Sequence, residues 1–301
     1  MIGSTVTQDA VVEEQLEPVA VRAVSPTRLA LRRFLRHRLA VVSLIVLALM
    51  ILAAIFAPLI APYNPTAQDA NSTLVGPGAG HLLGTDDLGR DILSRLIYGG
   101  RVTLGIGFGA TAVVLVIGLL VGAVAGYAGG WVDNVLMRFV DLVLSFPSLF
   151  LLLILAADAG VTLLSIILFI GLFGWMYLAR LVRGEFLVLR EMEYIEAARS
   201  VGVSGWRTVW RHMLPNTIAS IIVNATFSIA AAMYIEAALD FLGFGLSPEI
   251  PTWGSMLAAS ENYIAVNPLL TIAPGLLLTI AILAVNFIGD GLRDAFDPRS
   301  K

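Results

Sequence analysis

The chain has 301 residues, 58% of them hydrophobic and only 14% charged, with a net charge of −3 and a mean hydropathy of +0.87. A water-soluble domain usually carries about 25% charged residues, so this composition predicts an integral membrane protein. Cysteine is absent, which excludes disulfides and thiolate chemistry. The only lysine is Lys301, so a phosphate-binding loop with its lysine is excluded and any ATP hydrolysis must take place on another chain.

Residues 1–27 are predicted to form a disordered cytoplasmic tail, because they contain too few apolar residues to fold. Residues 28–62 are predicted to hold a short basic helix (28–38) at the membrane surface and the first span (39–61). A cleavable signal is not expected, since the apolar run is too long and an acidic tail precedes it.

Residues 63–102 are predicted to form an outer loop that contains an amphipathic helix at 87–98, lying in the membrane interface. Apolar and polar side chains would occupy opposite faces of that helix. The apolar face holds Ile92, Leu93, Leu96 and Ile97, and the polar face holds Arg90, Asp91, Ser94 and Arg95.

Residues 103–292 are predicted to form a core of five spans, at 103–128, 135–157, 161–181, 217–242 and 269–288, each about 20 mostly apolar residues long. The fold class is therefore an all-α membrane protein with six transmembrane helices. Pro147 and Pro274 are expected to kink their spans. The second span carries a row of small residues that suits close helix packing, either within the chain or between chains. This row consists of Gly105, Gly109, Gly118, Gly122 and Gly126.

Arginines concentrate before the first span, in the segment between the fourth and fifth spans, and after the sixth. The positive-inside rule therefore puts both termini, including residues 293–301, and the segment 183–215 in the cytoplasm. Among the few charges within spans, Arg138 and Asp141 are expected to pair with each other. Glu236 and Asp240 are candidates for a substrate pathway or for an anchor to an outer loop.

The cytoplasmic coupling loop spans 183–215, and the segment from Glu193 to Asn216 is predicted to form a helix through Arg199, a turn at Gly202 with positive φ, and a second short helix capped by Ser204. Pro215 would then open the fifth span. Trp206, Val209 and Trp210 form an apolar group on this projecting segment. Because such a group is costly to leave in water, we expect a docking partner there.

These residues resemble the EAA loop of ATP-binding-cassette importer permeases. The resemblance is carried by Glu196-Ala197-Ala198, by Gly202 and by Leu214-Pro215, although His212 stands where the family usually has an aliphatic residue. The sequence from Gly84 to Asp91, the run from Glu236 to Gly243, the pair Trp253-Gly254 and the ending from Gly289 to Arg299 are similar to the second permease subunit of dipeptide, oligopeptide and nickel importers.

The resemblance implies a type I importer-like fold in the inner membrane. It implies coupling to ATPases through Glu196, Ala197, Ala198, Gly202, Leu214 and Pro215. It also implies a second permease subunit, two ATPase subunits that bind ATP and Mg, and an extracytoplasmic peptide-binding protein. No cofactor in this chain and no nucleic-acid partner are expected. We assign Asn224, Ser228, Glu236 and Asp240 to the substrate pathway.

Asp240 and Glu249 replace a common serine and a common proline of the subfamily, which leaves substrate preference open between peptides, nickel and another small solute. An ATP-independent secondary transporter is a weaker alternative, because no inverted repeat or proton relay is evident. A membrane-embedded enzyme is weaker still, since no nucleophile–base pair is readable in the sequence.

Overall fold

The computed structural model describes residues 26–78 and 80–296, and these residues form helices joined by loops. Most of the predicted tail at 1–27, and residues 297–301, lie outside the described residues. The helices in chain order are α1 (Pro26–Arg36), α2 (Arg38–Ile55), α3 (Ala57–Ile60), η1 (Ala70–Ser72), α4 (Ile92–Ala128), α5 (Gly130–Leu144), α6 (Ser148–Ala159), α7 (Leu163–Arg190), α8 (Glu193–Ser200), α9 (Gly205–Thr208), the π-helical η2 (Val209–Met213), α10 (Leu214–Phe241), α11 (Trp253–Ser260), η3 (Glu261–Tyr263) and α12 (Leu269–Phe296).

Five helices of the described chain are long and apolar enough to cross a membrane, and a bent pair would make a sixth span. The five are α2, α4, α7, α12 and the continuous helix from Gly205 to Phe241. The pair is α5 and α6, which meet at 77°. Pro147 lies at this bend and precedes the first residue of α6, so the break expected there is confirmed. Pro274 lies inside α12, which continues past it.

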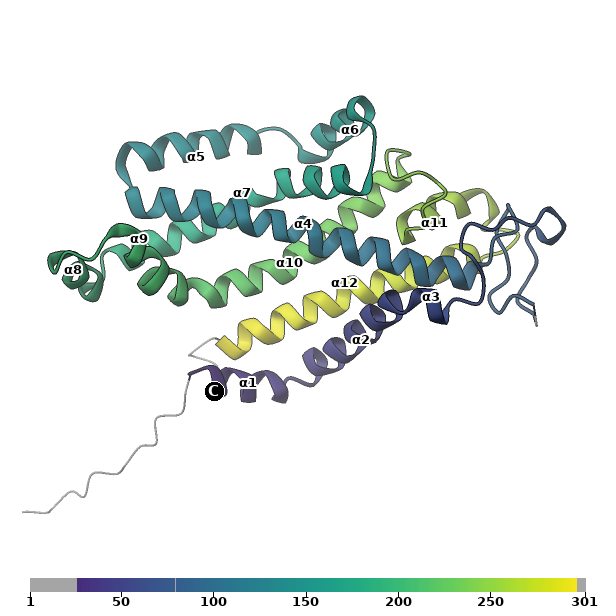
Figure 1. Cartoon of the computed structure of the whole chain (residues 1–301), viewed down its shortest axis with the longest axis horizontal. Coiled ribbons are helices and arrows are strands. Elements are labelled where there is room, and N and C mark those ends of the chain that lie inside the picture. Colours follow the sequence, from purple (N-terminus) through teal and green to yellow (C-terminus); the bar gives the residue numbers. More distant parts are fainter. Residues whose placement is uncertain (1–25, 79, 297–301) are drawn as a thin grey trace, which may run out of the picture.

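The long helices run side by side, with α8 and α9 at one end of the bundle and α11 at the other (Figure 1). We call these the α8 end and the α11 end. The most extensive contact joins α4 to α7, while α5 and α6 lie along the edge of the bundle. Three glycines of α4 (Gly118, Gly122 and Gly126) face α7 so closely that an added Cβ would overlap its residues. This part of the glycine row therefore serves packing within the chain.

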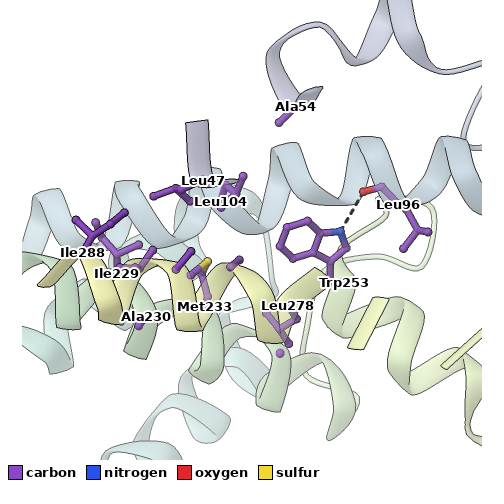
Figure 2. Close-up of a cluster of buried hydrophobic side chains, with 14 of the residues drawn as sticks. Leu47, Ala54, Leu96, Leu104, Ile229, Ala230, Met233, Trp253, Leu278 and Ile288 are labelled. Atoms are coloured by element: carbon purple, nitrogen blue, oxygen red, sulfur yellow. Dashed lines mark hydrogen bonds between the residues drawn. The ribbon is translucent and has the colours of Figure 1, made fainter. Parts of the chain in front are cut away.

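A buried cluster runs along α12 and ties α1, α2, α4, α10, α11 and α12 together, and Figure 2 shows part of it. Trp253, the first residue of α11, is only 2% exposed. Its indole nitrogen donates to the Leu96 carbonyl at 3.0 Å, and its backbone N–H donates to Thr103 Oγ1 at 3.2 Å. The ring lies against Gly99 and Gly100, which have no side chains in its way. A loop far along the sequence is thereby fixed to α4.

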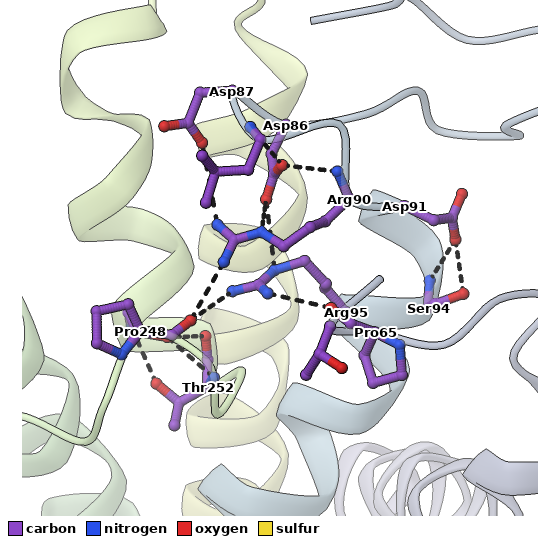
Figure 3. A network of polar contacts seen from close by, with 12 residues as sticks. Pro65, Asp86, Asp87, Arg90, Asp91, Ser94, Arg95, Pro248 and Thr252 are labelled. Carbon is purple, nitrogen blue, oxygen red and sulfur yellow. Dashed lines mark hydrogen bonds and ion pairs between the residues drawn. The ribbon is translucent and has the colours of Figure 1, made fainter. Parts of the chain in front are cut away.

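The prediction of an interfacial helix at 87–98 is wrong. The residues before Ile92 form turns, and Asp91 is the N-cap of α4. The predicted surface helix and the second span are thus one continuous helix. Both faces of the first turns of α4 are buried. The reason is a set of ion pairs and tertiary hydrogen bonds around Arg90 and Arg95, which are 5% and 3% exposed. Both guanidiniums bind Asp86 and the Pro248 carbonyl (Figure 3). The apparent polar face is therefore covered by protein.

Candidate functional site

The exposed helix α8 stands at the tip of the α8 end, directly after α7 (Figure 1). Ile195 is its one buried residue and attaches it to the bundle, and the Tyr194 hydroxyl accepts a hydrogen bond from Asn216 at 3.3 Å. Glu196 and Ala197 are exposed, and Ala198 is half-buried. The predicted coupling residues on α8 therefore present a free surface in this chain.

Gly202 ends α8 with φ +79°, as the sequence predicts. The Gly202 N–H donates to the Arg199 carbonyl at 2.9 Å, and the Val203 N–H donates to the Ala198 carbonyl at 3.0 Å. These two bonds form a Schellman motif, which requires the left-handed conformation that glycine adopts most easily. An added Cβ at Gly202 would meet no atom within 4 Å. The requirement for glycine is therefore set by the backbone and not by crowding.

The second helix begins after Ser204, as predicted, but the Ser204 side chain makes no capping hydrogen bond in the described chain, and the helix is neither short nor separate. From α9 the chain passes through the π-helical η2 into α10, so that Gly205–Phe241 forms one helix. Pro215 has no N–H to donate to the Arg211 carbonyl, so one α-helical hydrogen bond is missing there. In the π-helical η2 the pattern changes, and the Leu214 N–H donates to the Val209 carbonyl five residues earlier. A displacement of α9 would therefore be transmitted directly to α10.

Trp206 and Trp210 face α4 from this continuous helix. Their rings lie 5.2 Å apart, and they are 70% and 49% exposed. Together with Val209 they border an apolar groove whose other wall is the last part of α4. The apolar group expected to dock a partner thus continues onto a membrane-spanning helix.

Charged residues of α5 and α7 pair near the α8 end, but not as the sequence predicted. Asp141 bonds Arg180 at 2.5 Å, and no ion pair within the described chain joins it to Arg138. Asp133 accepts two bonds from Arg183, at 2.5 and 2.7 Å. The prediction was wrong because α5 packs beside α7, and this contact is not visible in the local sequence. These pairs attach the bent span to the bundle.

An open cavity lies between α7, α10 and α12 toward the α8 end. Asn224 lines it together with Ser220, Val223 and Phe227 of α10, and Arg293 of α12 contributes a cation. Ser228 lies one turn further along α10 and donates to the Asn224 carbonyl at 3.0 Å. The cavity thus carries a few polar groups on largely apolar walls, on the same helix that continues from α9.

Two matches define the family of this chain. The family described as "binding-protein-dependent transport system inner membrane component" matches residues 115–301, more than half of the sequence. A second description, "N-terminal TM domain of oligopeptide transport permease C", matches residues 25–77. The chain belongs to the binding-protein-dependent transport permeases. It is therefore the multi-pass inner-membrane component of an ATP-binding-cassette importer and is not itself the ATPase.

Relatives over nearly the whole length support this assignment. The chain is 41% identical over 279 residues to the dipeptide transport system permease protein DppC of Alkalihalophilus pseudofirmus, covering 93% of this chain and 92% of the relative. It is 38% identical over 278 residues to the glutathione transport system permease protein GsiD of Pectobacterium atrosepticum, covering 92% of each.

A solved structure has the same fold. It shows inward-facing conformations of the MetNI methionine ABC transporter, and the match has a TM-score of 0.56 at 23% identity. The alignment covers 68% of this chain and 98% of the solved one, so the shared fold leaves about a third of this permease unmatched.

Glu236 and Asp240 lie inside the protein, with exposed fractions of 0% and 6%. Asp240 Oδ1 accepts a bond from the Leu246 N–H at 3.1 Å, and Oδ2 accepts one from the Thr252 hydroxyl. Glu236 is buried beside Asp240, Thr252 and Thr103. Neither carboxylate reaches the surface of the described chain. Of the two candidates, Asp240 forms an anchor to the loop before α11.

Sequence reasoning also missed the polar cluster at the α11 end of the permease. Besides the contacts to Asp86 and Pro248, Arg95 donates to the Pro65 carbonyl at 3.2 Å, and Asp91 bonds His81 at 2.8 Å. The cluster fastens the segment before α4 to the loop before α11 (Figure 3). The sequence feature that could have predicted this cluster is the high proportion of charged residues at 86–95, which is unusual beside a membrane-spanning segment.

Proposed function

We propose that this permease imports di- and oligopeptides, together with a second permease subunit, two ATPases and an extracytoplasmic peptide-binding protein. The proposal for peptides is supported by the relatives named for dipeptide and glutathione transport, which match nearly all of the chain. Both termini and α8 would lie in the cytoplasm, in agreement with the distribution of arginine.

The observation that carries the proposed mechanism is the continuous helix from Gly205 to Phe241. One end of this helix follows the exposed α8 across the Gly202 turn, and its middle lines the cavity with Asn224. ATPases that dock on α8 and move it would move α10 as well, and with it the cavity wall. Glu196 and Ala197 are the contact residues that this proposal assigns.

A cross-linking experiment tests the docking site. The chain contains no cysteine, so a single cysteine at Ala197 can be cross-linked to cysteines on the ATPase surface in the assembled transporter. We expect a cross-link whose yield changes when ATP is added. Cysteine in place of Trp131, which is 77% exposed at the start of α5, is the matched control and should give none. Absence of any cross-link from position 197 would contradict the docking site.

The substrate is tested separately through the cognate binding protein. The solute that it retains on purification, identified by mass spectrometry, is expected to be a peptide. Retention of nickel or another small solute would leave the coupling mechanism in place and reject the peptide assignment.

A further inference from the structure

Glu236 is a fully buried acidic residue of α10, one helical turn before Asp240. Neither of its two side-chain oxygens has a hydrogen-bond partner within the described chain. The two oxygens of Asp240 do have partners, since they accept from the Leu246 N–H and the Thr252 hydroxyl. Only one of these two neighbouring carboxyls therefore has the donors that a buried negative charge requires.

No positive charge of the described chain is placed to neutralise Glu236. The helices α4, α7, α11 and α12 pack along α10. The helix α11 has no ionisable side chain, and the charged residues of α7 and α12 lie in the half of each helix nearest the α8 end (Figure 1). On α4, Arg95 is bound to Asp86 and to backbone carbonyls, and Arg101 lies in a groove beside α2. The charged group that acts on Glu236 is Asp240, which has the same sign.

Two negative charges at this place would be strongly unfavourable. A buried carboxylate without a partner is costly, and a second one beside it adds repulsion. Neighbouring carboxyls avoid this cost by holding one proton between them, as the two aspartates of aspartic proteases do. The site is also crowded, because a Cβ on Gly245 or Gly254 would overlap the Asp240 side chain. A hydrated cation would need space that these close contacts do not leave, whereas a proton needs none.

We propose that Glu236 binds a proton and donates it in a hydrogen bond to Asp240. The two carboxyls then carry a single negative charge, and Asp240 holds it with three donors instead of two. Glu236 is thereby a positioning residue, because it fixes the carboxylate that anchors the loop before α11. Trp253 fixes the end of the same loop to α4, so the acid pair helps to join α10 to α4 at the α11 end. The inference concerns this anchor alone and holds whichever solute the permease imports.

Infrared difference spectroscopy of the full permease in its assembled transporter detects the proton directly. A protonated carboxyl has a carbonyl stretching band that is well separated from the bands of a carboxylate. We expect Glu236→Gln to remove a carboxylic-acid band at neutral pH and to leave the carboxylate bands unchanged. The matched control is Glu249→Gln, which removes an exposed carboxyl from the loop before α11 and should remove carboxylate bands only. Loss of carboxylate bands in Glu236→Gln, with no acid band lost, would show that Glu236 is ionised and would overturn the proposal.

Hydrogen exchange of residues 243–253, measured by mass spectrometry, tests the hydrogen bond between the two carboxyls. Glu236→Gln keeps a neutral donor of nearly the same size, so this loop should exchange at the wild-type rate. Glu236→Leu has no donor and should exchange faster by about tenfold or more, because hydrogen bonds to charged groups are the stronger ones. Wild-type exchange in both variants would show that the anchor does not need Glu236, and equally fast exchange in both would show that a neutral donor does not replace it. Either result would overturn the proposal.

Discussion

Replacing Asp240 distinguishes an anchor from a pathway residue. In the structure this carboxylate is buried and holds the loop before α11 through the Leu246 N–H and the Thr252 hydroxyl. Gly245 and Gly254 permit the approach, since a Cβ on either would overlap the Asp240 side chain. Asp240→Ala removes both acceptors without adding bulk.

The expected cost follows from the two donors left behind. Leu246 and Thr252 are both buried, at 6% and 0% exposure, so water does not readily replace the carboxylate. A buried group that loses its hydrogen-bond partner costs about 1–3 kcal/mol, so the two together give a destabilisation of about 2–6 kcal/mol. Asp240→Asn keeps one acceptor oxygen and should cost less than Asp240→Ala.

Hydrogen exchange measured by mass spectrometry on residues 243–253 reports this loss. Even the lower limit of the expected destabilisation, about 2 kcal/mol, corresponds to more than tenfold faster exchange of the loop. Each 1.4 kcal/mol changes an opening equilibrium tenfold. Glu249→Gln, which changes an exposed carboxylate on the same loop, is the control and should leave exchange unchanged. Unchanged exchange in Asp240→Ala, with slower uptake of cationic peptides only, would refute the anchor and restore the pathway role.

Three further predictions address coupling, packing and topology. Gly202→Val should abolish ATP-driven transport while the permease stays inserted, because a β-branched residue resists positive φ. Gly202→Asn should keep most transport. Full transport by Gly202→Val would contradict the conclusion that the turn needs a residue with positive φ. Gly122→Ala should lower the free energy of unfolding by about 1–3 kcal/mol, because the added methyl group overlaps α7. Gly105→Ala is the control, since its methyl group would meet open space. Equal melting temperatures of the two variants would reject the close packing of α4 on α7. A cysteine at Glu191 should resist an impermeant maleimide in intact cells while one at His81 reacts, and labelling at 191 would reverse the orientation.

The membrane-spanning helices could be predicted because their signal is local. Runs of apolar residues located all of them, and Pro147 marked the broken span. Gly202 was predictable for the same reason, since its turn depends on hydrogen bonds within a few residues. Each of these features is determined by neighbours in the sequence.

The errors concern contacts between distant segments. Arg95 is covered by the Pro248 and Pro65 carbonyls, so a pattern that suggested an exposed helix belongs to a buried one. Asp141 bonds Arg180, 39 residues away, in preference to its sequence neighbour. The rotation of α10 decides whether Asp240 faces a pathway or a loop, and a single sequence with little periodicity does not determine that rotation.

The most direct test of the central claim is uptake of a labelled dipeptide into vesicles that contain this permease, its partner permease, the ATPases and the binding protein. The account predicts that uptake requires ATP, stops with orthovanadate and is lost in Gly202→Val while the complex stays intact. Dipeptide uptake that persists without ATP, or that is insensitive to orthovanadate, would contradict it.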